Sequence, residues 1–244
     1  MADQYDSIAD VYEQVKRIPI GLAETTTLVS ALPDLNGKSV LDVGCGAGYY
    51  PRLFRSAGAR RVAGVDAAQE MIAHAQRVEE RDPIGISYEL YDAAELPVMG
   101  AFDVVTAIWL LGYAPGADAL DAMVTRLAAN LVPGGELVVL FPNPDVDWDV
   151  LAGYSRYGMT VVGTGESAGR LSCTVHVEVD PPFDFESFYW PPGVVEATLE
   201  RGGFTGLTRY PVVVPAEALA ERGEGFWADL LACPTFAVYR AKLG

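Results

Sequence analysis

Basic residues are scarce in this 244-residue chain, which holds 17 Lys and Arg against 33 Asp and Glu and carries a formal net charge of −16. Phosphate backbones repel so acidic a chain, and its few basic residues form no cluster, so we expect no nucleic-acid partner. No apolar stretch reaches the ~20 residues that span a bilayer, and the amino-terminal segment lacks the apolar core of a signal peptide. We therefore expect a cytoplasmic protein without membrane contact.

Cysteine and histidine are rare as well. The three cysteines, Cys45, Cys173 and Cys233, lie far apart and form no CxxC or CxxH pair. Isolated cysteines in odd number suit reduced thiols, and no metal site is expected. Only two histidines, His74 and His176, are present as neutral-pH proton acceptors.

Short apolar runs alternate with helical patterns in the first part of the chain. The strands that this rhythm predicts are Ser39–Val43, Arg61–Val65, Ile86–Tyr91, Phe102–Ala107 and Glu136–Phe141. Their sequences are rich in Val, Ile and Leu and hardly alternate, which is typical of parallel strands covered on both faces. The pattern predicts an α/β protein with a doubly wound sheet.

The rhythm changes after Asn143-Pro144. Alternating apolar residues over Met159–Thr164 and Leu171–Val179 predict an antiparallel β insertion, which runs into the aromatic segment 183–190. The elements expected afterwards are a helix over Val194–Arg201, a strand near Phe204–Val214, a helical piece over Ala216–Ala232 and a last strand over Thr235–Ala241. We expect a single domain with a helical amino-terminal part (1–36), a core (37–142), a substrate-side insertion (143–190) and a carboxyl-terminal part that completes the sheet (191–244).

The segment VLDVGCGAGY, residues 40–49, joins a strand to the expected start of a helix through a glycine-rich turn. Glycines allow positive φ there and let the backbone approach a ligand at a helix N-terminus. The spacing is GxGxG, and Asp42 stands two residues before Gly44. A carboxylate in this place repels a pyrophosphate and attracts an ammonium group, which argues against the GxGxxG site of dinucleotides.

Two more acids follow the next two strands. Asp66 stands where a carboxylate accepts hydrogen bonds from ribose hydroxyls, and Asp92 stands where one can accept from an adenine amino group. Each acid is also a common helix N-cap residue. Because successive parallel strands end at one crevice, the three acids together predict a ligand site.

These segments resemble the class I S-adenosylmethionine-dependent methyltransferases. The matching pieces are VLDVGCGAG, VDAAQEMI, YDAAELP, FDVVTAIWLLGYA and LVPGGELVVL, which cover about residues 38–141 in order. The resemblance implies a Rossmann-like seven-stranded sheet, with an antiparallel last strand, that binds S-adenosyl-L-methionine. Asn143-Pro144, Phe188–Trp190 and FWADLLACP are similar to a toxoflavin-synthase-like branch, which methylates heterocyclic nitrogens in bacterial secondary metabolism.

The resemblance also implies the contacts of the cofactor. Its methionine part would lie against Asp42 and the loop, its ribose against Asp66, and its adenine beside Met71 and Asp92. The full set of implied cofactor contacts is Tyr5, Tyr12, Asp42, Gly44, Cys45, Gly46, Gly48, Asp66, Ala67, Met71, Asp92, Ala93 and Ile108. Tyr5 and Tyr12 lie on one face of the amino-terminal segment, which either packs on the domain or forms a lid over the ligand.

The acceptor is expected beside the fourth strand and the insertion. Candidate contacts to a flat, partly apolar small molecule are Trp109, Tyr113, Asn143, Tyr154, Tyr157, His176 and Tyr189. Tyr113 and His176 are the candidate catalytic groups, although many relatives carry a histidine where this chain has Gly112. Because a sulfonium is an activated methyl donor, we expect transfer to a nitrogen or a hydroxyl mainly through in-line alignment.

Other functions remain open. A nicotinamide-dependent oxidoreductase would use a similar sheet, although Asp42 and the GxGxG spacing argue against it. A non-catalytic module that binds S-adenosylmethionine would not need the aromatic insertion. A protein or lipid acceptor would need a more open site than a lidded one. We expect an enzyme with a small-molecule acceptor that acts as a monomer or a homodimer.

Overall fold

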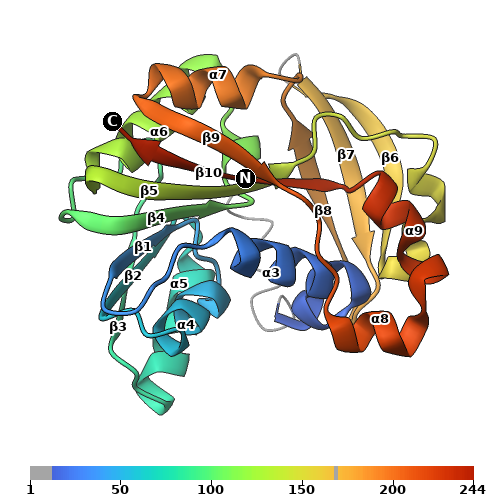
Figure 1. The fold of residues 1–244 in the computed structure, drawn as a ribbon, viewed down its shortest axis with the longest axis horizontal. Coiled ribbons are helices and arrows are strands. Elements are labelled where there is room, and N and C mark those ends of the chain that lie inside the picture. The colour runs from blue at the N-terminus through green and yellow to red at the C-terminus, as the bar shows by residue number, and fades with distance from the viewer. Residues whose placement is uncertain (1–12, 168–169) are drawn as a thin grey trace.

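The computed structural model describes residues 13–167 and 170–244, which form two sheets with helices around them (Figure 1). The larger sheet has seven strands in the order β3-β2-β1-β4-β5-β10-β9. They are β1 (Ser39–Val43), β2 (Arg61–Asp66), β3 (Ile86–Leu90), β4 (Phe102–Ile108), β5 (Leu131–Pro142), β9 (Phe204–Tyr210) and β10 (Phe236–Leu243). Strands β1 to β5 pair in parallel, and β10 runs antiparallel to both neighbours. The predicted sheet, with its antiparallel last strand, is confirmed.

Helices cover both faces of the large sheet. The described helical elements are the 3₁₀ segments η1 (Glu13–Arg17), η2 (Leu111–Tyr113) and η3 (Leu151–Tyr157) and the helices α3 (Pro19–Ala31), α4 (Tyr49–Ser56), α5 (Gln69–Arg81), α6 (Ala117–Ala129), α7 (Val194–Arg201), α8 (Ala216–Arg222) and α9 (Glu224–Ala232). Successive side chains of a strand point to opposite faces, so Val40 packs in one core with α3 and α4, and Leu41 in the other with α6 and α7. Figure 1 shows these two helical layers on either side of the sheet. No helix in the described ranges is long and apolar enough to cross a membrane.

The insertion forms the second sheet, of three antiparallel strands in the order β6-β7-β8. These are β6 (Met159–Ser167), β7 (Arg170–Val177) and β8 (Phe183–Tyr189). The antiparallel insertion expected from the sequence is present, and the aromatic segment that follows it is its third strand. Val175 pairs with Phe185 on the inner face, whereas His176 pairs with Asp184 on the outer face.

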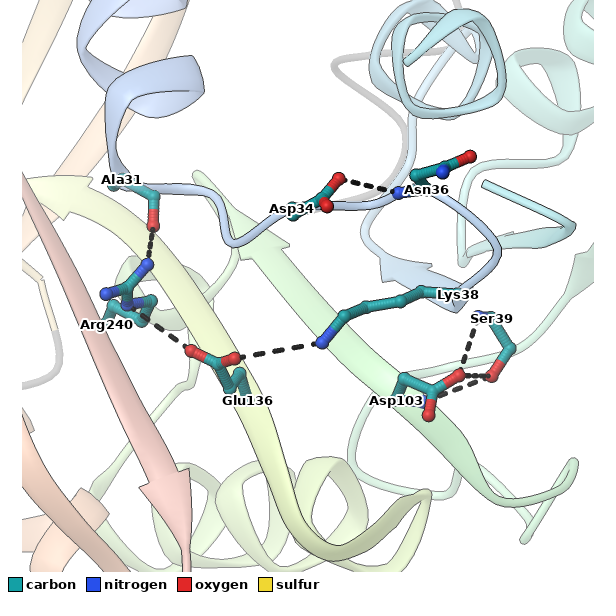
Figure 2. A network of polar contacts seen from close by, with 8 residues as sticks. All are labelled: Ala31, Asp34, Asn36, Lys38, Ser39, Asp103, Glu136 and Arg240. Carbon is teal, nitrogen blue, oxygen red and sulfur yellow. Dashed lines mark hydrogen bonds and ion pairs between the residues drawn. The ribbon is translucent and has the colours of Figure 1, made fainter. Parts of the chain in front are cut away.

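A polar network joins the end of α3 to the sheet (Figure 2). Arg240 of β10 donates to the Ala31 carbonyl at 3.2 Å and pairs with Glu136 of β5 at 3.4 Å. At the start of β1, the Ser39 N–H donates to Asp103 of β4 at 2.8 Å, and this bond, with a second from the Ser39 hydroxyl, lowers the pKa of Asp103. Because Ser39 begins β1, this end of the strand lies opposite the glycine loop, and the loop end is left for a ligand.

The remaining elements follow the sequence closely, with one division. Helix α7 has the predicted bounds, whereas Gly223, with a φ of +78°, separates the helical piece expected over 216–232 into α8 and α9. The expected lid with Tyr5 and Tyr12 lies outside the described residues, which begin with η1 and α3.

Candidate active site

A cleft of about 990 Å³ opens where β1, β2, β3 and β4 end. Most of the predicted cofactor contacts line it, namely Gly44, Cys45, Gly46, Asp66, Ala67, Met71, Asp92, Ala93 and Ile108. They lie at or after the carboxyl ends of four strands, which meet at one edge of the sheet, the usual ligand position in an open α/β fold. Parallel pairing therefore brings together side chains that are far apart in sequence.

The glycine loop has a backbone that other residues rarely adopt. Gly44, Gly46 and Gly48 have φ angles of +80°, +53° and +86°. Gly48 is also the N-cap of α4, and a Cβ at this position would lie 2.6 Å from the Tyr88 hydroxyl oxygen. The Gly44 N–H donates to the Val65 carbonyl at 2.8 Å, which holds the loop against β2.

Asp66 is fixed by backbone donors on both oxygens. Its Oδ2 accepts from the Gly46 N–H at 2.8 Å, and its Oδ1 accepts from the Ala68 N–H at 2.9 Å. A carboxylate has about four lone-pair sites, so both oxygens keep capacity for a ligand. Because Asp66 lines the cleft, this donor and acceptor set fits a ribose with vicinal hydroxyls.

Asp42 lies beneath the loop and not in the lining of the cleft. It is 0% exposed, its Oδ1 accepts from the Thr106 hydroxyl at 2.6 Å, and its buried Oδ2 has no hydrogen-bond partner among the described residues. Burial, opposed by the Thr106 hydrogen bond and reinforced by Asp66, raises its pKa to about 7. Asp42, which was expected to hold the methionine part of the cofactor, is therefore not among the residues that line the cleft.

Asp92 follows β3 and lines the cleft. Its Oδ1 accepts from the Ala94 N–H at 2.8 Å, as in a turn or an N-cap, and the residue is exposed. Leu90 and Tyr91, which sequence reasoning did not select, also line the cleft and are 50% and 36% exposed. Large apolar surface left open beside a cleft is a feature of binding sites.

A second cavity, of about 70 Å³, lies between η1, α3, the end of β4 and the inner face of the insertion sheet. Its apolar lining includes Val15, Ile20, Leu151, Val175, Phe183 and Phe185. Tyr154 and Tyr189 line it as predicted, although the Tyr154 hydroxyl donates away from it to the Asp229 carbonyl at 3.0 Å. Lys16, Trp109 and Tyr113 line both cavities, so the cleft and this smaller cavity meet there.

Two predicted substrate contacts stand at this junction. Trp109 has a φ of +59°, a strained conformation for a bulky residue, and its backbone N–H donates to the Leu140 carbonyl at 2.7 Å. Strain of this kind persists where the surrounding structure enforces it, which is common at functional sites. The Tyr113 hydroxyl donates to the Glu186 carbonyl at 3.1 Å and so joins η2 to the insertion sheet.

A buried charged cluster at the junction was missed from the sequence. Lys16 and Glu24 are 5% and 2% exposed and form an ion pair, while the Tyr50 hydroxyl donates to Glu24 Oε1 at 2.6 Å. Lys16 Nζ also lies 3.1 Å from the Tyr50 oxygen and 4.6 Å from the centroid of its ring. A signal was present, because Glu24 is the only charged residue of α3, PIGLAETTTLVSA.

Three predicted substrate contacts, His176, Asn143 and Tyr157, line neither cavity. His176 points outward, with a 37% exposed side chain whose Nδ1 lies 2.6 Å from Asp184 Oδ1. Asn143 is buried and donates to the Pro234 carbonyl at 2.7 Å, which anchors the chain after β5. Tyr157 is fully buried, and its hydroxyl donates to a backbone carbonyl of α9 at 2.7 Å.

Comparison with known proteins agrees with this geometry. Residues 40–135 match a family described as "Methyltransferase domain". The ribosomal protein L11 methyltransferase of Burkholderia ambifaria is 36% identical over 124 residues, which are 50% of this chain and 37% of that protein. The chain thus spans little more than a third of the length of that relative.

Solved structures resemble almost the whole chain. The CcbJ methyltransferase from Streptomyces caelestis is 21% identical and covers 99% of this chain and 98% of its own, with a TM-score of 0.68. CalS10 from Micromonospora echinaspora is an amino pentose methyltransferase solved with S-adenosylmethionine bound. It is 20% identical to this chain, and the match covers 96% of this chain and 97% of CalS10 with a TM-score of 0.58. Residues 40–135 are thus similar to a methyltransferase domain, and the chain as a whole has the fold of these solved methyltransferases.

Proposed function

We propose that this chain is an enzyme that transfers the methyl group of S-adenosylmethionine to a small, largely apolar acceptor. The observation that carries the proposal is the apolar cavity that meets the cofactor cleft at Trp109 and Tyr113. In such a pair of cavities, cofactor and acceptor are held end to end and water is excluded from the contact.

The residues present fit the cofactor. The glycine loop would hold the methionine part, Asp66 the ribose hydroxyls, and Met71 with Asp92 the adenine. The bound cofactor supplies an activated methyl group on a cationic sulfur. The chain supplies alignment, which alone is worth several kcal/mol of the barrier, and aromatic faces at the junction that attract positive charge by about 0.5–2 kcal/mol.

A small molecule is the acceptor that the geometry favours over a macromolecule. The acceptor cavity measures about 70 Å³, which can hold a small ring but not a segment of a folded protein or RNA. The net charge of −16 disfavours a polyanionic substrate such as RNA. The amino pentose acceptor named for CalS10 supports a small molecule, and methylation of nitrogen or oxygen in secondary metabolism is the role we propose for this chain.

Thermal unfolding with S-adenosylhomocysteine, with NAD⁺ in parallel, tests the cofactor. A ligand at about 100 times its Kd adds about 2.7 kcal/mol to the free energy of unfolding and raises the midpoint by a few degrees. We expect a shift with S-adenosylhomocysteine that Asp66→Ala reduces by about half and His176→Ala retains, because Asp66 lines the cleft and His176 does not. A shift with NAD⁺ alone would overturn the proposal and support an oxidoreductase.

A further inference from the structure

We propose that Glu24, held by Lys16 and Tyr50, is the contact that selects the acceptor, and that the acceptor is a small neutral ring with an N–H or O–H donor. The inference rests on the proposed function, because it assumes that the smaller cavity receives the acceptor. It goes further, since it names the chemical class of that acceptor and the group that recognises it.

Glu24 has one oxygen engaged and one available. Both of its hydrogen bonds to described residues, from Lys16 and from the Tyr50 hydroxyl, end on Oε1. No described residue donates to Oε2, although the side chain is 98% buried and lines the acceptor cavity. A carboxylate oxygen of a largely buried side chain that borders a cavity can accept a hydrogen bond from a donor on the molecule that fills the cavity.

The charges of the cavity exclude a charged acceptor. Among the described residues that line it, Lys16 is the only base and Glu24 the only acid, and they are paired with each other. A cationic or anionic acceptor would bring one uncompensated charge into an apolar enclosure, which is costly. A neutral acceptor leaves the pair intact and adds one charge-assisted hydrogen bond to Glu24.

The size of the cavity limits the part of the acceptor that enters. One water needs roughly 10–15 Å³ of such volume, so about 70 Å³ holds about five non-hydrogen atoms. A five-membered ring meets this limit, and Phe183 and Phe185 offer aromatic faces for it to stack against. Pyrazole is a matching probe, because its N–H can donate to Glu24 while its second nitrogen carries a free lone pair.

The same contact gives the released proton a destination. The lone pair of the second pyrazole nitrogen forms the new N–C bond to the methyl group, the C–S bond breaks and its electron pair stays on sulfur. The N–H proton of the ring passes to Glu24 Oε2, so neutral 1-methylpyrazole and a protonated Glu24 result. Glu24 need not be a strong base, because the ring N–H becomes strongly acidic once the ring is methylated.

The test compares pyrazole with isoxazole, in which the N–H is replaced by an oxygen and the ring is otherwise the same. Binding of each probe is measured by ligand-observed NMR at an S-adenosylhomocysteine concentration that saturates the protein used. We expect the unmodified protein to bind pyrazole at least about 10-fold more tightly than isoxazole. The variant Lys16→Met/Glu24→Met, which leaves no buried charge unpaired, should bind the two probes equally within about twofold.

The controls separate this inference from the proposed function. Glu24→Gln retains a neutral hydrogen-bond acceptor and should keep an intermediate preference of about threefold, and His176→Ala, on the outer face, should keep the full one. The inference is overturned if the unmodified protein binds the two probes equally, or if the double variant keeps the full preference for pyrazole. In either case, binding of S-adenosylhomocysteine would continue to support the proposed function. Failure of S-adenosylhomocysteine itself to bind would overturn the proposed function.

A second measurement tests the proton transfer. With S-adenosylmethionine and pyrazole, mass spectrometry should detect 1-methylpyrazole from the unmodified protein and at least 10-fold less from Lys16→Met/Glu24→Met. If the unmodified protein binds pyrazole and forms no 1-methylpyrazole, Glu24 is not the proton acceptor.

Discussion

The buried carboxyl of Asp42 makes the stability of this protein depend on pH in an unusual direction. Desolvation raises its pKa from an ordinary value of 3.8 to about 7 in the folded protein. Between about pH 4 and pH 7 the folded state therefore holds a proton that the unfolded chain has released. The free energy of unfolding consequently falls as the pH rises through this window and becomes independent of this group above about pH 7.

The magnitude follows from the two pKa values. Their difference, 7 − 3.8, is about 3, and each pKa unit corresponds to about 1.4 kcal/mol, so the whole effect is about 4 kcal/mol. Asp42→Asn keeps the shape and the acceptor for the Thr106 hydroxyl but does not titrate. The advantage of the Asn variant in free energy of unfolding should grow by about 4 kcal/mol from pH 4 to pH 8.

Urea unfolding of both proteins at half-unit pH steps measures this difference and cancels the contributions of other groups. Asp103→Asn is the matched control: hydrogen bonds from Ser39 lower the pKa of Asp103 below its ordinary value of 3.8, so the effect of this substitution should be nearly constant from pH 4 to pH 8. The stability that Asp103 contributes is present above its ordinary pKa and is lost as the pH falls through its folded pKa. If the advantage of Asp42→Asn stays constant within about 1 kcal/mol from pH 4 to pH 8, Asp42 is ionised in the folded protein and the reasoning is refuted.

Three further predictions concern the loop and the charged cluster. Asp66→Ala should weaken binding of S-adenosylhomocysteine at least 10-fold in calorimetry, since it removes an acceptor in the cleft; unchanged affinity would contradict its role. Lys16→Met alone should lower the free energy of unfolding by about 3–5 kcal/mol, because it leaves the Glu24 carboxylate buried without a cationic partner. Lys16→Met/Glu24→Met should lower it much less, and equal losses in the two variants would argue against a desolvated ion pair. Gly48→Ala should destabilise the fold by about 1–3 kcal/mol in urea unfolding, because its φ is +86° and its Cβ would meet Tyr88; a neutral effect would show that the loop relaxes.

The cofactor side of the site was largely predictable from the sequence. Strand order places the ends of β1, β2, β3 and β4 at one edge, and the residues there follow local patterns: GxGxG after one strand and an acid after each of the next two. Asp66 and Asp92 line the cleft as expected. Asp42 does not, because it lies within β1, where every residue is buried, and its side chain points to Thr106 of the neighbouring strand.

The acceptor side was predicted less well because it is assembled from elements that are distant in sequence. His176 and Val175 are neighbours on one strand, yet only Val175 faces the cavity, since the register of β7 against β8 decides which face is covered. Tyr157 was selected as an aromatic residue of the insertion, but its burial against α9 makes it part of the core.

The sequence by itself determined the α/β class, the positions of the parallel core strands along the chain and the glycine loop, because these depend on local periodicity and on the backbone freedom of glycine. Only the tertiary structure decided that Lys16 of η1, Glu24 of α3 and Tyr50 of α4 meet between two cavities. Hydrophobic periodicity records which faces are buried but carries no information on which buried faces touch. The polar groups that distinguish one acceptor from another are placed by those contacts.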